Sequence, residues 1–212
     1  MKSKLLFLFL CLSFSSGVFA EDAYWEMKYA DLLDPYPTMG SPAERYDFEQ
    51  LMYLQNTRTN EQCLAAAHEE DASLKAFFGG AHGLLSDVEV NKMQKKMRMI
   101  TIKAGAKILV SKTRYNRPRP YITYPQIKPC IELESSKAYP SGHATVARMY
   151  ARILAATFPE RAILFLKRGD EVGFYRVLGG VHHPSDVAAG KILGDSLADD
   201  FLEDNFQFMA AD

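Results

Sequence analysis

Three short segments of the chain carry residues whose types and spacing suit the binding of an oxyanion. The first runs from Lys112 to Pro120 and holds four cations among its first eight residues. Pro118 and Pro120 restrict the backbone on either side of Arg119, and a guanidinium held in place favours two-pronged recognition of an oxyanion. Cations near a helix end also complement the helix dipole while staying solvated, so this segment alone leaves both interpretations open.

The second segment is Pro140-Ser141-Gly142-His143, which precedes an apolar helical pattern. The free N–H groups of a first helical turn bind anions, Gly142 allows a ligand to approach the backbone, and the Ser141 hydroxyl adds a donor. His143 would face an anion bound at this position. A serine N-cap followed by a partly buried histidine is the structural alternative for the same residues.

The third segment extends from Arg176 to Asp186 and includes His182 and His183. Pro184 predicts a helix that starts directly after the histidines, so Asp186 in its first turn can fold back toward His182. A carboxylate there can hold one ring nitrogen and leave the other free as a nucleophile or base. Two alternatives remain, a metal site on His182 and Asp186 or a plain helix-start motif. We expect no metal, because the chain has 5 histidines and no clustered third and fourth ligand.

Together, the three segments supply cationic oxyanion binders, a helix terminus that can cradle an anion, and two histidines, one of which has an orienting aspartate. These are the parts needed for phosphoryl transfer through a covalent phosphohistidine. Positioning and charge neutralisation carry most of the catalysis in reactions of this class. The fold must therefore bring the three segments to one place.

Helical patterns dominate the rest of the chain and predict an all-α, single-domain bundle. Ser41-Pro42-Ala43-Glu44 is a capping box that opens one helix, and Ser86 with Glu89 is another that opens the longest helix. Residues 116–140 hold five of the 10 prolines, which predicts loop or turn there. The expected helices are one carrying Phe48, Leu51, Met52 and Leu54, then 60–70, 72–78, 86 to about 112–115, 141–157, 159–177 and 184–206. In the longest, the apolar residues at roughly helical spacing are Val90, Met93, Met97, Ile100, Ile102, Ala106, Leu109 and Val110.

The composition fits one globular domain and gives no bulk reason to expect a polyanionic partner. Of 212 residues, 48% are hydrophobic and 24% are charged, which supports one sizeable core and excludes collagen-like and wholly disordered chains. The 25 Lys and Arg against 26 Asp and Glu leave a formal charge of −1. We therefore expect no nucleic-acid partner, and any charge that matters must be local.

The first twenty residues predict a secretory signal peptide. Lys2 and Lys4 precede an apolar run, and small residues lead to Ala20, which suits cleavage before Glu21. The run is about half the ~20 residues that a spanning helix needs, so an uncleaved anchor is the alternative and no stable membrane insertion is expected. Cleavage leaves 212 − 20 = 192 residues in the periplasm or outside the cell. They comprise an extended N-terminal arm over residues 21–40 and a helical catalytic domain over residues 41–212.

Export changes the meaning of the cysteines. Cys11 leaves with the signal peptide, which places Cys63 and Cys130 in an oxidising compartment. Two outcomes are open for this pair: a disulfide, or two buried thiols that pack as small hydrophobic residues.

The three chemical segments form one ordered pattern. Six residues separate Lys112 from Arg119-Pro120, then Pro140-Ser141-Gly142-His143 follows, then five residues separate Arg176 from His182 and three more precede Asp186. The register is set by Lys112, because Arg117-Pro118 would require a lysine where the chain has Val110. This pattern resembles the three-part motif of the type 2 phosphatidic acid phosphatase superfamily.

Within that superfamily, the chain most resembles the class A bacterial non-specific acid phosphatases over roughly residues 35 to 205. The further shared residues are Lys167-Arg168-Gly169, Glu171, Gly173, Tyr139 and Pro35-Tyr36-Pro37. Two positions depart from the family. Tyr175 stands where a serine usually precedes the arginine of the third segment, and Ala144 stands where class A enzymes usually have threonine.

The resemblance implies a metal-independent hydrolase of phosphate monoesters that has an all-helical fold and needs no cofactor. His182 would attack phosphorus, oriented by Asp186, and His143 would protonate the leaving oxygen and then activate water. The phosphate binders would be Lys112, Arg119, Ser141, the Gly142 amide and Arg176. Because the two histidines need opposite protonation states, we expect a bell-shaped pH profile, and the resemblance implies an acidic optimum.

Three other functions use similar residues. A vanadium-dependent haloperoxidase has the same kind of pocket, but such chains are commonly much longer and nothing here marks a halide site. A lipid phosphatase acting at an interface is the second. A non-catalytic phosphate-binding protein needs only cations and a helix terminus, so the two histidines and Asp186 disfavour it. The partners we expect are small phosphorylated substrates, and self-association into a homo-oligomer stays open.

Overall fold

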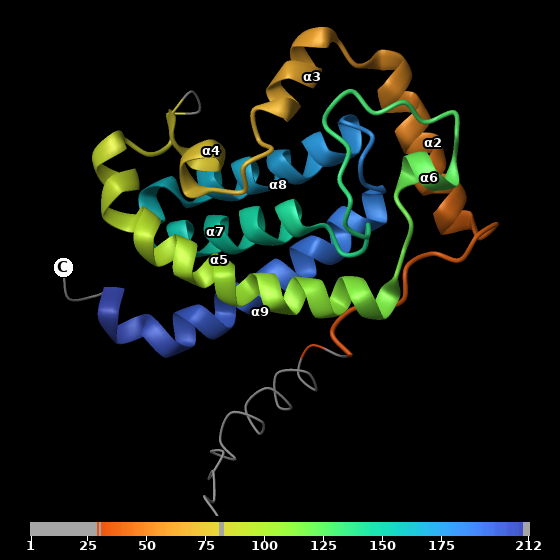
Figure 1. Ribbon diagram of the computed structural model, residues 1–212. Coiled ribbons are helices and arrows are strands. Elements are labelled where there is room, and N and C mark those ends of the chain that lie inside the picture. The colour runs from red at the N-terminus through yellow and green to blue at the C-terminus, as the bar shows by residue number, and fades with distance from the viewer. Residues whose placement is uncertain (1–28, 30, 81–82, 210–212) are drawn as a thin grey trace, which may run out of the picture.

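Helices make up most of the chain, and the part of the chain that the structure describes contains no strand (Figure 1). The computed structural model describes residue 29, residues 31–80 and residues 83–209, with side chains up to residue 203. The all-α prediction is confirmed within these residues. In chain order the elements are α2 (Pro42–Thr57), α3 (Asn60–Ala67), α4 (Leu74–Phe78), α5 (Asp87–Tyr115), α6 (Pro120–Thr123), α7 (Gly142–Thr157), the 3-10 turn η2 (Pro159–Arg161), α8 (Ala162–Leu178) and α9 (Pro184–Met209).

The helix starts follow the capping residues that the sequence offers. Ser86 and Glu89 form a complete capping box at the start of the 29-residue α5. Ser41 accepts a hydrogen bond from the Glu44 N–H at 3.1 Å, whereas the Glu44 carboxylate bonds the Gly40 N–H instead of closing the box on Ser41. Each cap satisfies backbone donors that the helix itself leaves without partners, so these boundaries are local properties of the sequence.

α7 lies at the centre of the molecule, with α8 and α9 packed against it (Figure 1). α9 approaches α7 closely because two glycines face it. A Cβ on Gly194 would lie 2.5 Å from the Thr145 carbonyl oxygen, and a Cβ on Gly190 would lie 2.6 Å from the Ser141 carbonyl oxygen. This approach brings the starts of the two helices together, and the Ser141 N–H donates to the Asp186 carbonyl at 2.9 Å.

The largest hydrophobic cluster surrounds this central helix. Its members come from α4, α5, α7, α8 and α9, while two smaller clusters bury Leu51 of α2 and Ala66 of α3. Among its fully buried residues are Phe77, Phe78, Met149, Tyr150, Leu154, Phe165 and Leu193.

α5 runs across one face of this core and ends beside the second and third chemical segments (Figure 1). One side of the helix is buried, as Val90, Met97 and Ile108 show. The apolar spacing correctly predicted the helix, but not every apolar residue in it is buried: Ile102 and Leu109 are 58% and 63% exposed. α5 packs on α4 and α7 along one stripe only. No helix in the described ranges is both long and apolar enough to cross a membrane.

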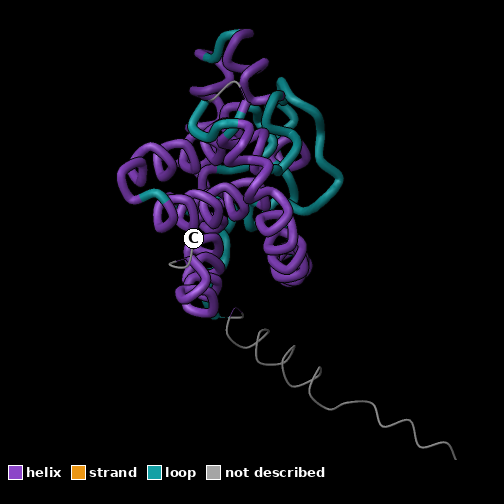
Figure 2. Tube along the Cα trace, turned by 90° about the vertical axis from the view of Figure 1, so that its left-hand side faces the viewer, coloured by secondary structure: helices purple, strands orange, loops and turns teal. Residues whose placement is uncertain are grey.

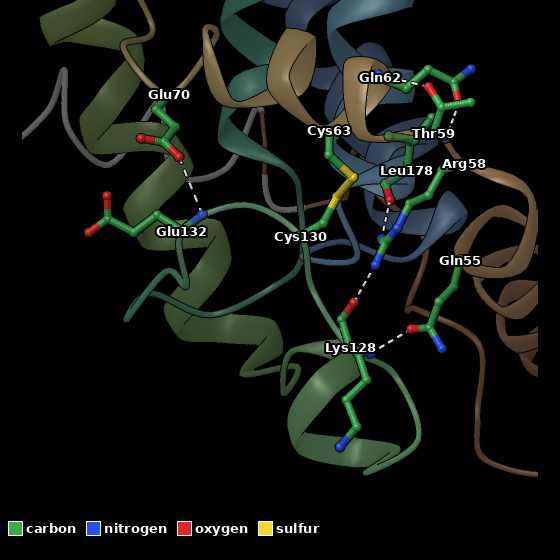
Figure 3. Close-up of a disulfide and its surroundings, with 10 residues drawn as sticks. All are labelled: Gln55, Arg58, Thr59, Gln62, Cys63, Glu70, Lys128, Cys130, Glu132 and Leu178. Atoms are coloured by element: carbon green, nitrogen blue, oxygen red, sulfur yellow. Dashed lines mark hydrogen bonds between the residues drawn. A yellow bond between two sulfur atoms is a disulfide. The ribbon is translucent and has the colours of Figure 1, made fainter.

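The proline-rich stretch between α5 and α7 is mostly loop, as predicted, and it stands with other loops on one side of the helices (Figure 2). It contains one short helix, α6, which the sequence did not predict. Asn116 ends α5 in the left-handed conformation at φ 50°. A disulfide joins Cys63 of α3 to Cys130 of this loop, so of the two outcomes left open for the cysteines the structure has the bridge (Figure 3).

The described part of the expected N-terminal arm lies against the body of the protein. Leu33 is buried, the Tyr115 hydroxyl donates to the Leu33 carbonyl, and the Tyr139 hydroxyl donates to the Asp34 carbonyl at 2.6 Å. The predicted signal peptide and the first residues of the arm lie outside the described residues.

Candidate active site

The fold brings the three chemical segments to one site at the ends of four helices. α5 contributes its last turns, α7 its N-terminus, α8 its last turn, and α9 its first turn together with the loop before it. The N-termini of α7 and α9 present free N–H groups that favour an anion, whereas the last turns of α5 and α8 contribute cationic side chains, Lys112 and Arg176. The predicted residues located there are Lys112, Arg119, Ser141, Gly142, His143, Arg176, His182 and Asp186.

His182 is completely buried and hydrogen-bonded through both ring nitrogens. Its Nδ1 lies 3.2 Å from Asp186 Oδ2, and its Nε2 lies 2.8 Å from Arg119 Nη1. A carboxylate only accepts and a guanidinium only donates, so Nδ1 carries the proton and Nε2 presents its lone pair. Burial, and then the nearby charge of Arg119, lower the pKa of His182 to about 3, which keeps the ring neutral above that pH.

Asp186 is held by more partners than the sequence predicted. Besides His182, its Oδ2 accepts from the His183 backbone N–H at 2.8 Å and faces His183 Nδ1 at 3.0 Å. Its Oδ1 accepts from Arg117 Nη1 at 2.6 Å. Burial alone would raise the pKa of Asp186, but the hydrogen bonds from both histidines and the Arg117 charge hold it well below its usual range. The carboxylate is therefore ionised and fixed in orientation.

Arg117 and Asp47 are buried residues of this network that the sequence analysis missed. Arg117 Nη2 donates to Asp47 Oδ2 at 2.9 Å, and Asp47 Oδ1 accepts from the Ser185 N–H at 3.0 Å. The Tyr36 ring of the arm lies 4.9 Å from the Arg117 guanidinium carbon. Arg117 stands among the cations of the first segment, but no local pattern marks Asp47 in the middle of α2.

The two site arginines differ in how many partners they have. Arg119 donates to the Ser136 carbonyl at 2.8 Å, to the Ser136 hydroxyl at 2.9 Å and to the Val181 carbonyl at 2.9 Å. Arg176 is 1% exposed, yet its Nε and Nη1 have no hydrogen-bond partner in the protein. Buried guanidinium donors are rarely left unused, so Arg176 points to a ligand with oxygen acceptors.

Lys112 adds a third cation whose charge depends on pH. It is buried, and its ammonium donates to the Lys137 carbonyl. Burial, and then the neighbouring charge of Arg119, lower the pKa of Lys112 to about 8. The group is charged at neutral and acidic pH and is poised to lose its proton in mildly alkaline solution.

Glu134, which the sequence analysis did not single out, lies among these cations. Its carboxylate accepts from Arg119 Nη2 at 2.5 Å and from Arg176 Nη2. Burial alone would raise the pKa of Glu134, but the positive groups around it outweigh burial and hold it far below its usual range. A carboxylate thus occupies the space between the two guanidinium groups.

His143 stands at the mouth of the site. Its Nε2 lies 3.0 Å from the Glu70 carbonyl, its Nδ1 lies 3.7 Å from Glu134 Oε1, and its side chain is 15% exposed. Burial, and then the Arg176 charge, lower the pKa of His143 to about 4. A dianionic ligand between Arg119 and Arg176 would oppose this effect and favour the protonated ring.

The N-terminus of α7 supplies the backbone part of the site. Ser141 is the N-cap, and its hydroxyl accepts from the Ala144 N–H at 3.4 Å. A Cβ on Gly142 would meet only ordinary contacts, 3.6 Å from Ile108 Cγ2 and 4.0 Å from Lys112 Cε. Packing therefore does not require glycine at this position.

Ala144 and Tyr175, the two residues that depart from the family pattern, differ in their surroundings. Ala144 is completely buried inside the first turn of α7. The Tyr175 hydroxyl donates to Glu171 at 3.3 Å, which gives it a partner on its own helix. Among the described residues, no group of three or more His, Cys, Asp and Glu side chains could hold a metal ion.

Comparison with known sequences identifies the family to which the chain belongs. The profile of the PAP2 superfamily matches residues 95–198. A non-specific acid phosphatase from Providencia stuartii is 31% identical over 171 residues, covering 76% of this chain and 69% of that protein. An acid phosphatase from Zymomonas mobilis is 30% identical over 174 residues, covering 76% of this chain and 64% of that protein, just under two thirds of its length.

Two solved structures are similar in fold. The transmembrane PAP2-type phosphatidylglycerolphosphate phosphatase from Bacillus subtilis aligns with a TM-score of 0.57 at 17% identity, covering 89% of this chain and 94% of that one. LpxE from Aquifex aeolicus aligns with a TM-score of 0.59 at 20% identity, covering 74% of this chain and 94% of that one. At these identities, the likeness establishes the helical arrangement alone.

Proposed function

The chain belongs to the PAP2 superfamily of phosphatases, and from this premise we propose that it is an exported, metal-independent acid phosphatase that hydrolyses phosphate monoesters through a phosphohistidine on His182. One observation carries the proposal. Asp186 fixes the proton of His182 on Nδ1, so the Nε2 lone pair faces Arg119 in a pocket where Arg176 keeps free donors. This geometry supports a nucleophilic histidine aimed at an oxyanion.

The first half of the reaction transfers the phosphoryl group to the protein. Lys112, Arg119 and Arg176 neutralise the phosphoryl oxygens while His182 Nε2 attacks phosphorus. The P–N bond forms as the P–O bond to the leaving group breaks, and His143 gives its proton to the leaving oxygen. Asp186 stabilises the positive charge that develops on the His182 ring.

The second half returns the enzyme to its starting state. His143, now neutral, takes a proton from a water molecule, and the oxygen of that water attacks phosphorus. The P–N bond breaks, His182 recovers its lone pair, and inorganic phosphate leaves. Three cations already neutralise the phosphoryl charge, which is the role that a metal ion plays in other phosphatases.

The decisive experiment is hydrolysis of a chromogenic aryl phosphate by the purified protein in the presence of EDTA. We expect turnover by the wild type and none above background by His182→Ala. His68→Ala is the matched control because His68 is exposed and outside the site, and it should retain full activity. Wild-type protein without turnover, or an active His182→Ala, would refute the mechanism.

Export is supported by the first twenty residues and by the disulfide, because disulfides persist mainly in oxidising compartments. Fractionation of the producing cells, with sequencing of the mature N-terminus, tests it. The proposal requires a periplasmic or secreted product that begins at Glu21. Full-length protein in the cytoplasm would contradict it.

A lipid phosphate is the second candidate substrate. Ile102, Leu109 and Val110 expose apolar side chains on α5, within the three turns before Lys112. Such a face could rest on a micelle or bilayer while the site engages a headgroup phosphate. Comparing turnover of a soluble aryl phosphate and of phosphatidic acid in mixed micelles separates the two substrate classes.

A further inference from the structure

The Glu134 carboxylate lies where the proposed mechanism requires the substrate phosphoryl group. It is bonded to Arg119 at 2.5 Å and to Arg176, and it faces His143 Nδ1 at 3.7 Å. Each of these three side chains has a role toward phosphate in the mechanism above. A carboxylate shares with phosphate the negative charge and the paired oxygen acceptors that guanidinium groups recognise.

Glu134 is not needed to hold Arg119 in place. Arg119 has its own anchors on the Ser136 carbonyl and hydroxyl and on the Val181 carbonyl. A carboxylate with purely structural purpose would also be expected to satisfy the buried cation beside it. Glu134 meets only Nη2 of Arg176 and leaves Nε and Nη1 without partners. The pocket therefore offers more donors than Glu134 uses.

We propose that Glu134 is an internal competitor for the phosphate site, which a substrate or product phosphate must displace and which thereby sets the affinity for phosphate. The proposal rests on the phosphate site of the proposed function, but not on turnover. A phosphate dianion brings more charge and a third oxygen for the free donors of Arg176, so it can replace the carboxylate. Anions with one charge and two oxygens gain no such advantage and are disfavoured.

The exchange requires rotation of one side chain rather than movement of a loop. The Tyr121 hydroxyl holds the Glu134 carbonyl at 2.7 Å. Before Glu134, the Cys63–Cys130 disulfide fixes the loop to α3 (Figure 3). Two hydrogen bonds also hold Lys128: Arg58 donates to its carbonyl, and its N–H donates to the Gln55 side-chain oxygen at 2.5 Å. The Glu134 side chain is 24% exposed, so it has a path into solvent.

The test measures equilibrium binding of inorganic phosphate by dialysis or calorimetry, with no turnover involved. Glu134→Gln keeps the size of the side chain and removes its charge, and we expect it to bind phosphate about tenfold more tightly than the wild type. Glu132→Gln is the matched control. Glu132 is exposed in the same loop, and the same change of charge there should leave the affinity unchanged.

A second variant covers the case in which Glu134→Gln does not fold. Glu134→Asp keeps the negative charge but is one methylene shorter, so it cannot span both guanidinium groups as well. We expect it also to bind phosphate more tightly than the wild type. Unchanged or weaker binding in whichever variant folds would overturn the proposal, and weaker binding would identify Glu134 as a scaffold for the arginines.

The outcomes separate this proposal from the proposed function. If the Glu134 variants bind phosphate more tightly but no protein hydrolyses the aryl phosphate, the role of Glu134 as a competitor is supported and the proposed phosphatase activity is rejected. Turnover by the wild type with no gain of affinity in the variants would do the reverse. Absence of phosphate binding from wild type and variants alike would reject both.

Discussion

At the scale of single residues, the site combines a neutral histidine with buried cations, and this combination fixes the pH range of activity. In the proposed mechanism His182 must be neutral to attack, so kcat/KM should fall as the pH drops through about 3, the pKa that burial and Arg119 impose on it. In the same mechanism His143 must be protonated to act as the acid, so kcat/KM should begin to fall as the pH rises through about 4, the pKa that burial and Arg176 impose on it in the free protein. It should fall more steeply above about pH 8, where Lys112 loses the charge that would hold phosphate. A pH profile of the wild type measures all three changes of slope.

The contribution of Lys112 can be assigned with one substitution. Lys112→Arg keeps a cation that stays charged throughout the measured range, so the steeper fall of kcat/KM above about pH 8 should disappear while the changes at lower pH stay in place. If Lys112→Arg shows the same steeper fall as the wild type, Lys112 does not cause it.

Arg117 is a positioning residue that acts through Asp186. Removing it leaves Asp186 and Asp47 buried without their shared cation, and breaking a buried pair in this way costs about 3–5 kcal/mol. We expect Arg117→Met to lower kcat about tenfold or more and to raise the pH of the acidic limb, because Asp186 then ionises less readily. Arg117→Lys should recover part of both effects.

Unfolding titrations and pH profiles of the two Arg117 variants provide the check. A purely structural role would lower the free energy of unfolding of Arg117→Met while its folded fraction kept the wild-type pH profile. That result would remove Arg117 from the site.

At the scale of the elements, the close approach of α7 and α9 depends on small residues at the contact. A Cβ at position 194 would lie 2.5 Å from the Thr145 carbonyl oxygen of α7. Because this oxygen belongs to the helix backbone, it can make room only if the helix itself moves. We expect Gly194→Ala to lower the free energy of unfolding by about 1–3 kcal/mol.

Gly105→Ala is the opposite case and serves as the control. A Cβ there meets nothing within 4 Å, and the position is an exposed turn of α5, so the change should stabilise the protein by about 0.5–1 kcal/mol. Chemical denaturation of both variants tests the pair. Equal stability of Gly194→Ala and the wild type would contradict the contact.

The elements themselves were largely predictable because their signals are local. The capping box at Ser86, the proline that opens α9 and the serine that caps α7 each act within one helical turn. The three chemical segments were recognised for the same reason, since the residues within each are close in sequence. Glu134 and Asp47 could not be found in this way, because each is a single carboxylate whose partners lie in other elements.

At the scale of the whole molecule, the disulfide joins the proline-rich loop to α3 across 67 residues of sequence. Its main effect should be to restrict the unfolded chain, and removing a native disulfide typically costs about 2–5 kcal/mol. We expect the Cys63→Ser, Cys130→Ser double variant to lose stability in this range. It should still cleave an aryl phosphate at low temperature, since neither cysteine touches the site.

Thermal unfolding of oxidised and reduced wild type, alongside the double variant, provides the measurement. Reduced wild type should match the double variant. A double variant as stable as the oxidised protein would show that the bridge contributes nothing.

The bond from the Ser141 N–H to the Asp186 carbonyl has a consequence for the order of events during folding. It joins the start of α7 to the start of α9, and both helices contribute residues to the site. A partly made chain that lacks α9 therefore cannot contain the complete site. The first turn of α9 must therefore be free to fold before His182 acquires its orienting carboxylate. Contacts this distant in sequence form late, because the entropy of closing long loops opposes them. The recovery of phosphatase activity should therefore follow the slowest phase of refolding and never precede it.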